Sequence, residues 1–237
     1  MNKWPKIIPP PTPEEKRVND DFMEYWHNVL PKTYGFADKF NHEYAVKNAP
    51  MEFLKTLEIG AGLGEHLDYE KLSLDQRKSY HSVELRANMV QQIRERYPDV
   101  NVVHGDCQKK LPFEDGYFDR ILAIHVLEHL PDLPACIAEM YRLCNKDHGI
   151  FSVVIPCEGS LAYSLAREIS AKRIFEKRYK VSYHQFISRE HINLPWEIYE
   201  ELKKHFKITH VSHYPLKIPF QFCNLFIGIT LRPKTNL

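Results

Sequence analysis

The fold of this chain is decided by the stretch Leu57-Glu58-Ile59-Gly60-Ala61-Gly62-Leu63-Gly64-Glu65-His66. A short apolar strand runs directly into three glycines at alternate positions. Glycine adopts positive φ angles and lets a ligand approach the backbone closely. The turn then opens a helix, whose free N–H groups favour negatively charged groups. The stretch therefore predicts a strand, a glycine turn and a helix start that together bind a ligand.

The spacing of these glycines separates two kinds of ligand. The dinucleotide fingerprint is G-x-G-x-x-G, in which the turn cradles a pyrophosphate. Here the third glycine, Gly64, comes one residue early, and Glu65 occupies the expected place. A carboxylate at that place would repel the phosphates. The turn therefore suits a ligand that contains a nucleoside but no pyrophosphate.

Two acidic residues follow at the ends of the next predicted strands. Glu84 comes about 20 residues beyond the turn, where a carboxylate accepts hydrogen bonds from ribose hydroxyls. Asp106, in His104-Gly105-Asp106-Cys107, is placed to accept from an adenine amino group. Taken alone, a glycine turn also occurs at tight strand–helix corners, and an acidic residue at a strand end is often a solvated cap. Because all three strand ends lie at the carboxyl edge of an open α/β sheet, their order and spacing favour a nucleoside site.

Strands and helices alternate around these motifs. Strands are expected at Lys55–Ile59, Ser79–Glu84, Val100–His104, Phe118–Ile124 and Gly149–Ile155, and near Ile208–His213 and Leu225–Leu231. Helices are expected at about Glu65–Lys71, Arg86–Tyr97, Leu133–Leu143 and Trp196–Phe206, and residues 157–205 read as largely helical with an interruption around Val181–His191. This alternation predicts a parallel sheet with helices on both faces.

The N-terminal residues differ from the rest of the chain. Residues 1–13 are rich in proline, which removes backbone donors and favours extended conformations, so we expect a loose arm. A helix is expected from Thr12–Pro13 onward, with apolar residues at helical spacing. Pro31 is expected to end this helix, and residues 32–50 are expected to be irregular.

The composition excludes several classes of protein. Lys and Arg number 32 and Asp and Glu 31, so the net charge of +1 argues against a general polyanion binder such as a nucleic-acid-binding protein. The five cysteines form no C-x-x-C pair, which suits a reducing compartment. Because no apolar run is long enough for a signal peptide or a membrane span, we expect a cytoplasmic protein without a membrane partner.

Four segments resemble the S-adenosylmethionine-dependent class I methyltransferases, specifically the small-molecule branch close to the ubiquinone-biosynthesis type. They lie within residues 55–156 and read LEIGAGLG, SVELRANMV, HGDCQKKLPFEDGYFDRILAIHVLEHLPD and GIFSVVIP. The resemblance implies a Rossmann-like, doubly wound, seven-stranded sheet that is mostly parallel with an antiparallel last strand. It also implies S-adenosylmethionine as the cofactor and a small molecule as the methyl acceptor.

The resemblance further implies how the chain is divided. Residues 1–50 would form an N-terminal arm and a helical lid, with the segment Tyr34–Tyr44 in the lid. Residues 51–237 would form the methyltransferase domain, with a helical insertion on the acceptor side at about residues 157–205. No oligomeric state is predicted.

The same resemblance assigns cofactor-binding residues at the glycine turn. Gly60, Ala61 and Gly62 would pass under the methionine part of the cofactor. Glu58, at a position where Asp is commoner, would support the turn.

Further cofactor contacts are implied at the ends of the second and third strands. Glu84 would hold both ribose hydroxyls, with Leu85 against the adenine. Asp106 and the backbone of Cys107 would meet the adenine edge.

The end of the fourth strand carries a motif with two interpretations. The backbone of Ile124 and His125 would face the methionine amino group, which places His125 at the mouth of the cofactor pocket. The stretch His125-Val126-Leu127-Glu128-His129 also matches the H-x-x-E-H pattern of one zinc-peptidase group. That site requires both histidines on one helix, whereas His125 directly follows a strand and Pro131 closely follows His129. We therefore expect no metal, with a zinc hydrolase using His125 and His129 as an alternative.

The acceptor side is predicted from a polar and aromatic cluster over residues 183–193. A hydroxyl acceptor needs a general base with a pKa near the working pH, and histidine meets that demand. The candidate bases are His125, His184 and His191. The candidate substrate-binding residues are Tyr183, Arg189 and, from the lid, His42. The cluster can equally be a capped loop before the next helix.

A basic run over residues 167–180 reads either as a solvated helix face or as a contact for an anionic acceptor. The predicted reaction is methyl transfer to a hydroxyl of a sugar-like or natural-product acceptor. A non-catalytic S-adenosylmethionine-binding partner domain is the alternative of a different class.

Overall fold

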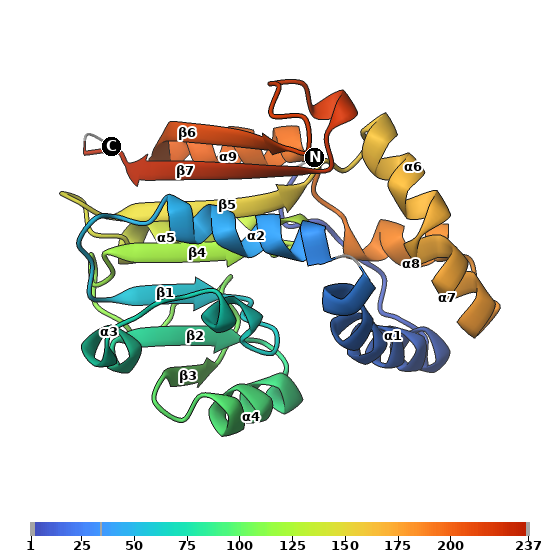
Figure 1. The fold of residues 1–237 in the computed structure, drawn as a ribbon, viewed down its shortest axis with the longest axis horizontal. Helices are drawn as coiled ribbons and strands as arrows, with labels where there is room; N and C mark the ends of the chain where they lie inside the picture. The colour runs from blue at the N-terminus through green and yellow to red at the C-terminus, as the bar shows by residue number, and fades with distance from the viewer. Residues whose placement is uncertain (1–2, 34, 236–237) are drawn as a thin grey trace.

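The structure is a computed structural model that describes residues 3–33 and 35–235. Within this range a seven-stranded sheet has the order β3-β2-β1-β4-β5-β7-β6 (Figure 1). The strands are β1 (Thr56–Ile59), β2 (Tyr80–Glu84), β3 (Asn101–His104), β4 (Arg120–Ile124), β5 (Ile150–Pro156), β6 (Phe206–Tyr214) and β7 (Phe226–Pro233). Strands β1 to β5 pair in parallel, whereas β7 is antiparallel to both β5 and β6. The predicted Rossmann-like sheet with an antiparallel last strand is therefore confirmed.

Helices cover both faces and the carboxyl edge of the sheet (Figure 1). The helices are α1 (Pro13–Thr33), α2 (Gly35–Lys47), α3 (Leu74–Lys78), α4 (Ala87–Arg96), α5 (Leu133–Leu143), α6 (Leu161–Ile169), α7 (Ala171–Tyr179), α8 (Tyr183–Glu190) and α9 (Pro195–His205), with short 3₁₀ turns η1 (Glu65–Asp68), η2 (Leu127–His129) and η3 (Gln221–Cys223). In Figure 1, α2 crosses the front of β4 and β5, while α1, α6, α7 and α8 gather beyond the carboxyl ends of the parallel strands.

Helix α5 illustrates how the sequence dictates the packing. Its buried apolar residues recur at intervals of three and four, from Leu133 through Ile137 and Met140 to Leu143, so they form one face. Asp132 caps the helix by accepting a hydrogen bond from the Ala135 N–H at 3.3 Å. This face packs into the central core, which is why the predicted bounds Leu133–Leu143 agree with the structure.

Three expectations about local structure were wrong. Residues 32–50 are not irregular, because α2 occupies Gly35–Lys47, and Pro31 does not end α1. The helix expected over Glu65–Lys71 is only the short turn η1. Tertiary packing explains α2: Ala45 is fully buried, and the ring of Tyr44 is buried against β7. Tyr34, which was assigned to the lid, lies outside the described residues.

The interruption expected around Val181–His191 is also wrong, because α8 fills most of it. Ser182 caps this helix, its hydroxyl accepting from the Gln185 N–H at 3.5 Å. The chain turns just before it at Lys180, which has a left-handed φ of 53°. The many polar residues of this segment hid its helical pattern in the sequence. In the structure, Tyr183 of this amphipathic helix packs with Phe175 in an apolar cluster separate from the central core.

The buried guanidinium of Arg120 holds both α2 and the segment after η1 against the sheet. The side chain of Arg120 at the start of β4 is fully buried, and it donates to the Ala45 carbonyl of α2 at 3.0 Å. Its Nη1 lies 2.6 Å from Glu70 Oε1, and the same oxygen lies 2.7 Å from His66 Nε2. These contacts tie α2, η1 and β4 together below the glycine turn.

We expect Gly228→Ala to destabilise the protein. A Cβ added at Gly228 on β7 would lie 2.4–2.6 Å from three atoms of the Tyr44 ring, so α2 or β7 must shift. Overpacking of this kind costs about 1–3 kcal/mol of unfolding free energy, which urea denaturation measures. Gly35→Ala at the start of α2 is the matched control, because nothing lies within 4 Å of its added Cβ. Equal stability of the two variants would contradict the close approach of α2 to β7.

Candidate active site

The glycine turn has the geometry that only glycine adopts readily. Gly60, Gly62 and Gly64 have φ angles of 63°, 57° and 79°. A Cβ at Gly60 would lie 2.4 Å from a methyl carbon of Val126, so side chains are excluded here on two grounds. The turn is joined to β2 through the Gly60 N–H, which donates to the Val83 carbonyl at 2.8 Å.

The carboxylate of Glu84 links the end of β2 to the glycine turn. Its Oε2 accepts from the Gly62 N–H at 3.1 Å, and its Oε1 accepts from the Arg86 N–H at 2.9 Å. Each oxygen retains a lone pair with which it can accept from a ribose hydroxyl. Leu85, the residue beside it, leaves 62% of its surface exposed, as a side chain that covers an adenine face requires.

The third strand brings Asp106 to the same edge. The Gly105 N–H donates to the Glu84 carbonyl at 3.0 Å, which fastens the loop after β3 to the end of β2. Asp106 Oδ1 accepts from the backbone and side-chain nitrogens of Gln108, each at 3.0 Å. Cys107 is buried beside it. The residues predicted to meet the ribose and the adenine are thus neighbours.

Glu58 lies on β1, two residues before the glycine turn. It is buried on β1, and its Oε2 accepts from the Tyr80 hydroxyl at 2.8 Å. Burial raises the pKa of its carboxyl to about 8, because desolvation outweighs the hydrogen bond from Tyr80. Its predicted support of the glycine turn stays a prediction.

His125 follows β4 directly, with an unusual backbone. Its N–H donates to the Val154 carbonyl at 2.9 Å, and its φ is 54°, a left-handed value that costs a side-chain-bearing residue about 1 kcal/mol. Its Nδ1 lies 3.1 Å from Glu128 Oε1, and its ring stands edge-on to Phe226. Its Nε2 is buried and makes no hydrogen bond to any described residue.

Glu128 stands at the centre of three histidines. Its carboxylate is 1% exposed and lies near His125, His129 and His191. Burial raises the pKa of Glu128, but the hydrogen bond with His125 and the electrostatic effects of the three histidines together more than offset this, so the pKa falls below its ordinary value. Burial lowers the pKa of His129 to about 4, so this imidazole is neutral near pH 7.

The insertion supplies the other half of this cluster. His191, just after α8, holds its Nδ1 2.7 Å from Glu158 Oε2, and the same oxygen accepts from Arg167 at 2.7 Å. The rings of His129 and His191 stand edge to face at 5.0 Å. Sequence reasoning missed Glu158, although it follows the end of β5 and so carries the same signal as Glu84.

Other predicted acceptor residues lie elsewhere. His184 is exposed on α8, and Tyr183 is buried against Phe175, where desolvation raises its pKa to about 12. Arg189 donates to the Pro9 carbonyl at 2.5 Å, so it holds the N-terminal arm. Their roles in catalysis and substrate binding stay predictions.

His42 joins the network under α2. Its Nε2 lies 3.4 Å from Asp38 Oδ1, and its ring stacks on Tyr69 with the centroids 4.7 Å apart. Its predicted contact with substrate also stays a prediction.

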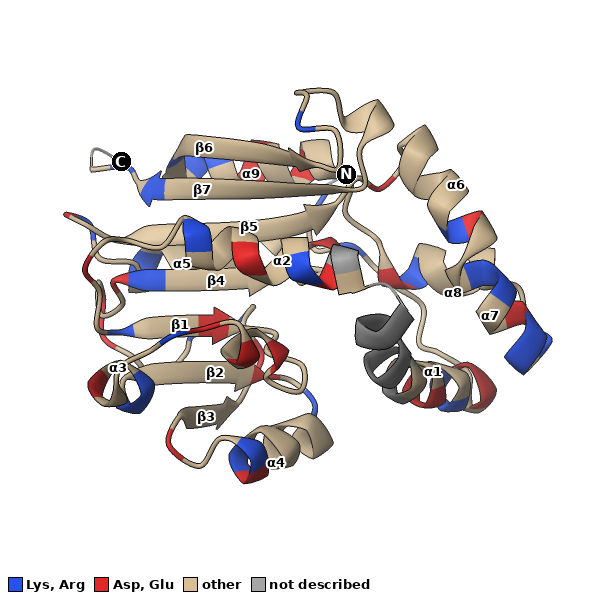
Figure 2. Cartoon of the chain, viewed as in Figure 1, with Lys and Arg blue, Asp and Glu red and all other residues tan. Residues whose placement is uncertain are grey.

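The charges differ between the two sides of the site. Figure 2 shows Lys and Arg along α7, whereas Asp and Glu gather at the carboxyl end of β1 and the turn after it. Part of the basic run is paired: Lys172 lies 2.7 Å from Glu168, and Arg178 lies 3.0 Å from Asp21. These pairs are what a solvated helix face requires.

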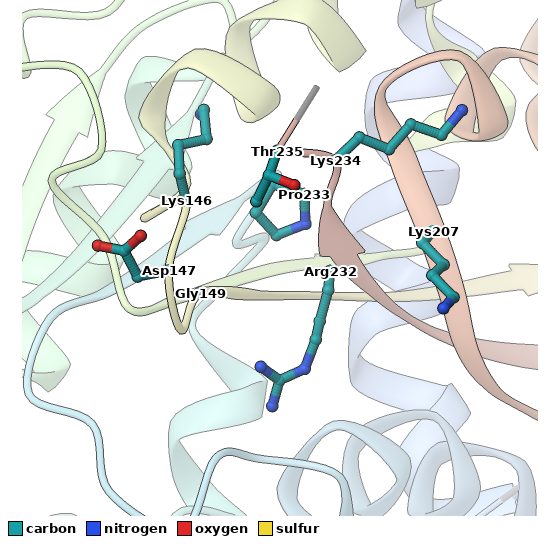
Figure 3. Close-up of a pocket in the computed structure, with 8 residues that line it drawn as sticks. All are labelled: Lys146, Asp147, Gly149, Lys207, Arg232, Pro233, Lys234 and Thr235. Atoms are coloured by element: carbon teal, nitrogen blue, oxygen red, sulfur yellow. The ribbon is translucent and has the colours of Figure 1, made fainter. Parts of the chain in front are cut away.

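A cavity of about 420 Å³ lies at the opposite edge of the sheet (Figure 3). It is lined by Lys146, Asp147, Gly149, Lys207, Arg232, Pro233, Lys234 and Thr235. In Figure 3 the side chains of Lys146 and Lys234 extend upward and those of Lys207 and Arg232 extend downward, so the four cationic groups do not converge on one point. This cavity is separate from the glycine turn.

Comparison with known proteins agrees with this geometry. Residues 57–153 match the model of a methyltransferase domain. A protein of Mycolicibacterium smegmatis, named a probable S-adenosylmethionine-dependent methyltransferase, is 31% identical over 100 residues. That match covers 42% of this chain and 37% of the relative, so it spans little more than a third of the relative's length.

Solved structures extend the likeness to most of the fold. The PH0226 protein of Pyrococcus horikoshii superposes with a TM-score of 0.60 at 17% identity, over 89% of this chain and 99% of that one. A TehB-like SAM-dependent methyltransferase of Corynebacterium glutamicum gives 0.57 at 15% identity, over 91% and 97%. Residues 57–153 thus match a methyltransferase domain, and most of the chain shares the fold of these structures. None of the described helices is long and apolar enough to cross a membrane.

We expect Glu84→Gln to weaken binding of demethylated cofactor, S-adenosylhomocysteine, about 10- to 100-fold, because hydrogen bonds to a charged group are worth about 1.5–3 kcal/mol. Titration calorimetry measures the affinity. Thermal unfolding without ligand checks that the variant keeps its fold, since Glu84 also holds Gly62. Glu114→Gln, an exposed acid in the loop before β4, is the control. Unchanged affinity in Glu84→Gln would exclude this carboxylate from the cofactor site.

We expect Glu58→Gln to flatten the pH dependence of stability. The folded-state pKa of about 8 lies above the usual 4.5, so folding favours the neutral acid. The stabilisation is complete below about pH 4.5 and is lost as the pH rises through about 8. Glutamine cannot ionise, so the variant should gain stability relative to the parent between about pH 5 and 8, measured by thermal unfolding. Glu95→Gln on α4 is the exposed control, and parallel curves for Glu58→Gln and the parent protein would contradict the raised pKa.

Proposed function

We propose that this protein transfers the methyl group of S-adenosylmethionine to a hydroxyl of a small, sugar-like or natural-product acceptor. The observation that carries the proposal is the Glu84 carboxylate, which is hydrogen-bonded to the glycine turn at the carboxyl edge of the sheet. A histidine whose Nε2 is unpartnered among the described residues, His125, follows the neighbouring strand β4. Methyl transfer to a hydroxyl requires a carboxylate that binds the cofactor and a general base, both at the same edge of the sheet.

The residues present fit the cofactor. Glu84 would hold the ribose, Leu85 would cover the adenine, and the bare backbone at Gly60 and Gly62 would carry the amino-acid part. When bound, the cofactor supplies a methyl group on a positively charged sulfur, ready for in-line displacement. The protein's contribution is orientation and exclusion of water, which lower the barrier by several kcal/mol.

His125 is the residue we propose as the general base. Glu128 orients its Nδ1 at 3.1 Å, in the arrangement by which a carboxylate fixes the tautomer of a catalytic imidazole. Nε2 then accepts the acceptor's hydroxyl proton. The left-handed backbone and the edge-on contact with Phe226 hold the ring in place.

The polar groups from the insertion support an acceptor rich in oxygen. Glu158, Arg167 and His191 form a hydrogen-bonded chain beside the Glu128 cluster, and such groups suit the hydroxyls of a sugar-like molecule. The cysteines described are all free, which supports the proposal that the protein works in a reducing compartment such as the cytoplasm.

The direct test is a release assay. The purified full chain is incubated with S-adenosylmethionine and a panel of hydroxylated sugars, phenols and carboxylates, and S-adenosylhomocysteine is quantified by mass spectrometry. Acceptor-dependent release with a matching mass gain on a hydroxylated member supports the proposal. Tight binding of S-adenosylhomocysteine with no release on any acceptor would favour the non-catalytic partner domain instead.

With an acceptor in hand, His125→Ala should lower kcat about 10²- to 10⁴-fold, the usual worth of a general base. Affinity for S-adenosylhomocysteine should change far less, because the cofactor contacts expected of this residue come from its backbone. His148→Ala, at the opposite edge of the sheet and more than half exposed, is the control. Wild-type kcat in His125→Ala would leave orientation alone as the source of catalysis.

A further inference from the structure

Three side chains at the carboxyl edge have the composition of a metal site. Glu128 and His129 come from η2, and His191 comes directly after α8, more than sixty residues later. Each offers a ligand atom, and these atoms all lie within 4.8 Å of one another. Two imidazoles and one carboxylate form a ligand set known from catalytic zinc sites.

Both imidazoles are oriented by a partner on their other nitrogen. His129 Nδ1 lies 2.8 Å from the Glu190 carbonyl, and His191 Nδ1 lies 2.7 Å from the Glu158 carboxylate. A backbone carbonyl and a carboxylate are the usual outer partners of metal-binding histidines, where they fix the tautomer with Nε2 as the ligand. His129 Nε2 faces Glu128, at 3.9 Å from Oε1.

The carboxylate has an oxygen to spare. Glu128 Oε1 is 3.1 Å from His125, whereas Oε2 is buried and makes no hydrogen bond within the described part of the chain. An unpartnered carboxylate oxygen in a buried position is costly, so it calls for a partner that the protein itself does not provide.

The backbone holds the two halves of the cluster together. The N–H groups of Ile192 and Asn193 both donate to the Glu128 carbonyl, at 2.9 and 3.0 Å. The side chain of Asn193 donates to the carbonyls of Leu127 and Leu130, at 2.7 and 2.8 Å. Because four hydrogen bonds fix the segment after α8 to η2, the three candidate ligands are presented on one supported frame.

We propose that Glu128, His129 and His191 bind a divalent transition-metal ion, for which zinc is the best match to the ligand set. Three protein ligands leave a further position open for water or for an oxygen of a bound molecule. Atoms bound to zinc at about 2.0–2.1 Å lie about 3.4 Å apart in a tetrahedron, so binding draws the three side chains roughly 1 Å closer. The H-x-x-E-H pair alone does not form this site; His191 completes it.

The test uses the full chain without a polyhistidine tag, stripped with EDTA and dialysed. Titration calorimetry with zinc chloride should show one saturable equivalent. Cobalt chloride should give visible absorption bands typical of a low-coordinate site with nitrogen ligands. Glu128→Gln and His191→Ala should each weaken zinc binding at least about 100-fold, since even outer partners of metal ligands are worth 10- to 100-fold. His184→Ala, on the exposed face of α8, should bind zinc as the parent does.

The outcomes are decisive in either direction. No saturable zinc binding by the parent, or equal affinity in Glu128→Gln, His191→Ala and the parent, would overturn the proposal. Circular dichroism and thermal unfolding show which variants are folded; the two substitutions lie on different segments, so one folded variant suffices. The measurement needs neither cofactor nor acceptor, so its failure leaves the proposed methyl transfer standing, and failure of methyl transfer leaves this site standing.

Discussion

The hydrogen bond from the Gly62 N–H to the Glu84 carboxylate is the interaction on which the site depends. It joins the glycine turn after β1 to the end of β2. The Glu84 carboxylate is thereby held beside the backbone of a glycine, where no side chain stands in the way of a ligand. Because β1 and β2 are parallel neighbours, their carboxyl ends meet at one edge, and a single carboxylate reaches both. The bond also explains why glycine is required: the turn must pass close to Glu84, with left-handed angles on either side of the contact.

The remaining functional groups accumulate on the same edge for the same topological reason. His125 directly follows β4, and Glu158 comes two residues after the end of β5, so two neighbouring strands bring an imidazole and a carboxylate to the same edge. The insertion after β5 then folds back and places His191 against them. The parallel sheet thus positions His125 and Glu158. The insertion after β5 adds His191, a partner from a more distant part of the chain.

Much of the sheet and the grouping of the glycine turn, Glu84 and Asp106 at its carboxyl edge could be predicted from the sequence, because those signals are local. The glycines at alternate positions, the apolar strands and the acids that end them can each be read within about ten residues. Helix α2 could not be predicted, because it is stabilised by the burial of Tyr44 and Ala45 against strands that are distant in the sequence. Tyr44 packs against β7, more than a hundred residues later, and the Ala45 carbonyl accepts a hydrogen bond from Arg120 on β4. The pairing of His129 with His191 is hidden for the same reason: each appears alone in the sequence, and only the fold brings them together.

The buried guanidinium of Arg120 holds α2 against the sheet. Withdrawing α2 from the sheet would take the Ala45 carbonyl away from Arg120 and leave a buried donor without its partner, which costs about 1–3 kcal/mol. Helices α1, α7 and α8 share an apolar cluster of their own, formed by residues such as Val18, Phe22 and Phe175. Helix α2 is thus built into the central domain, whereas α1, α7 and α8 pack around an apolar cluster of their own beyond the carboxyl ends of the parallel strands.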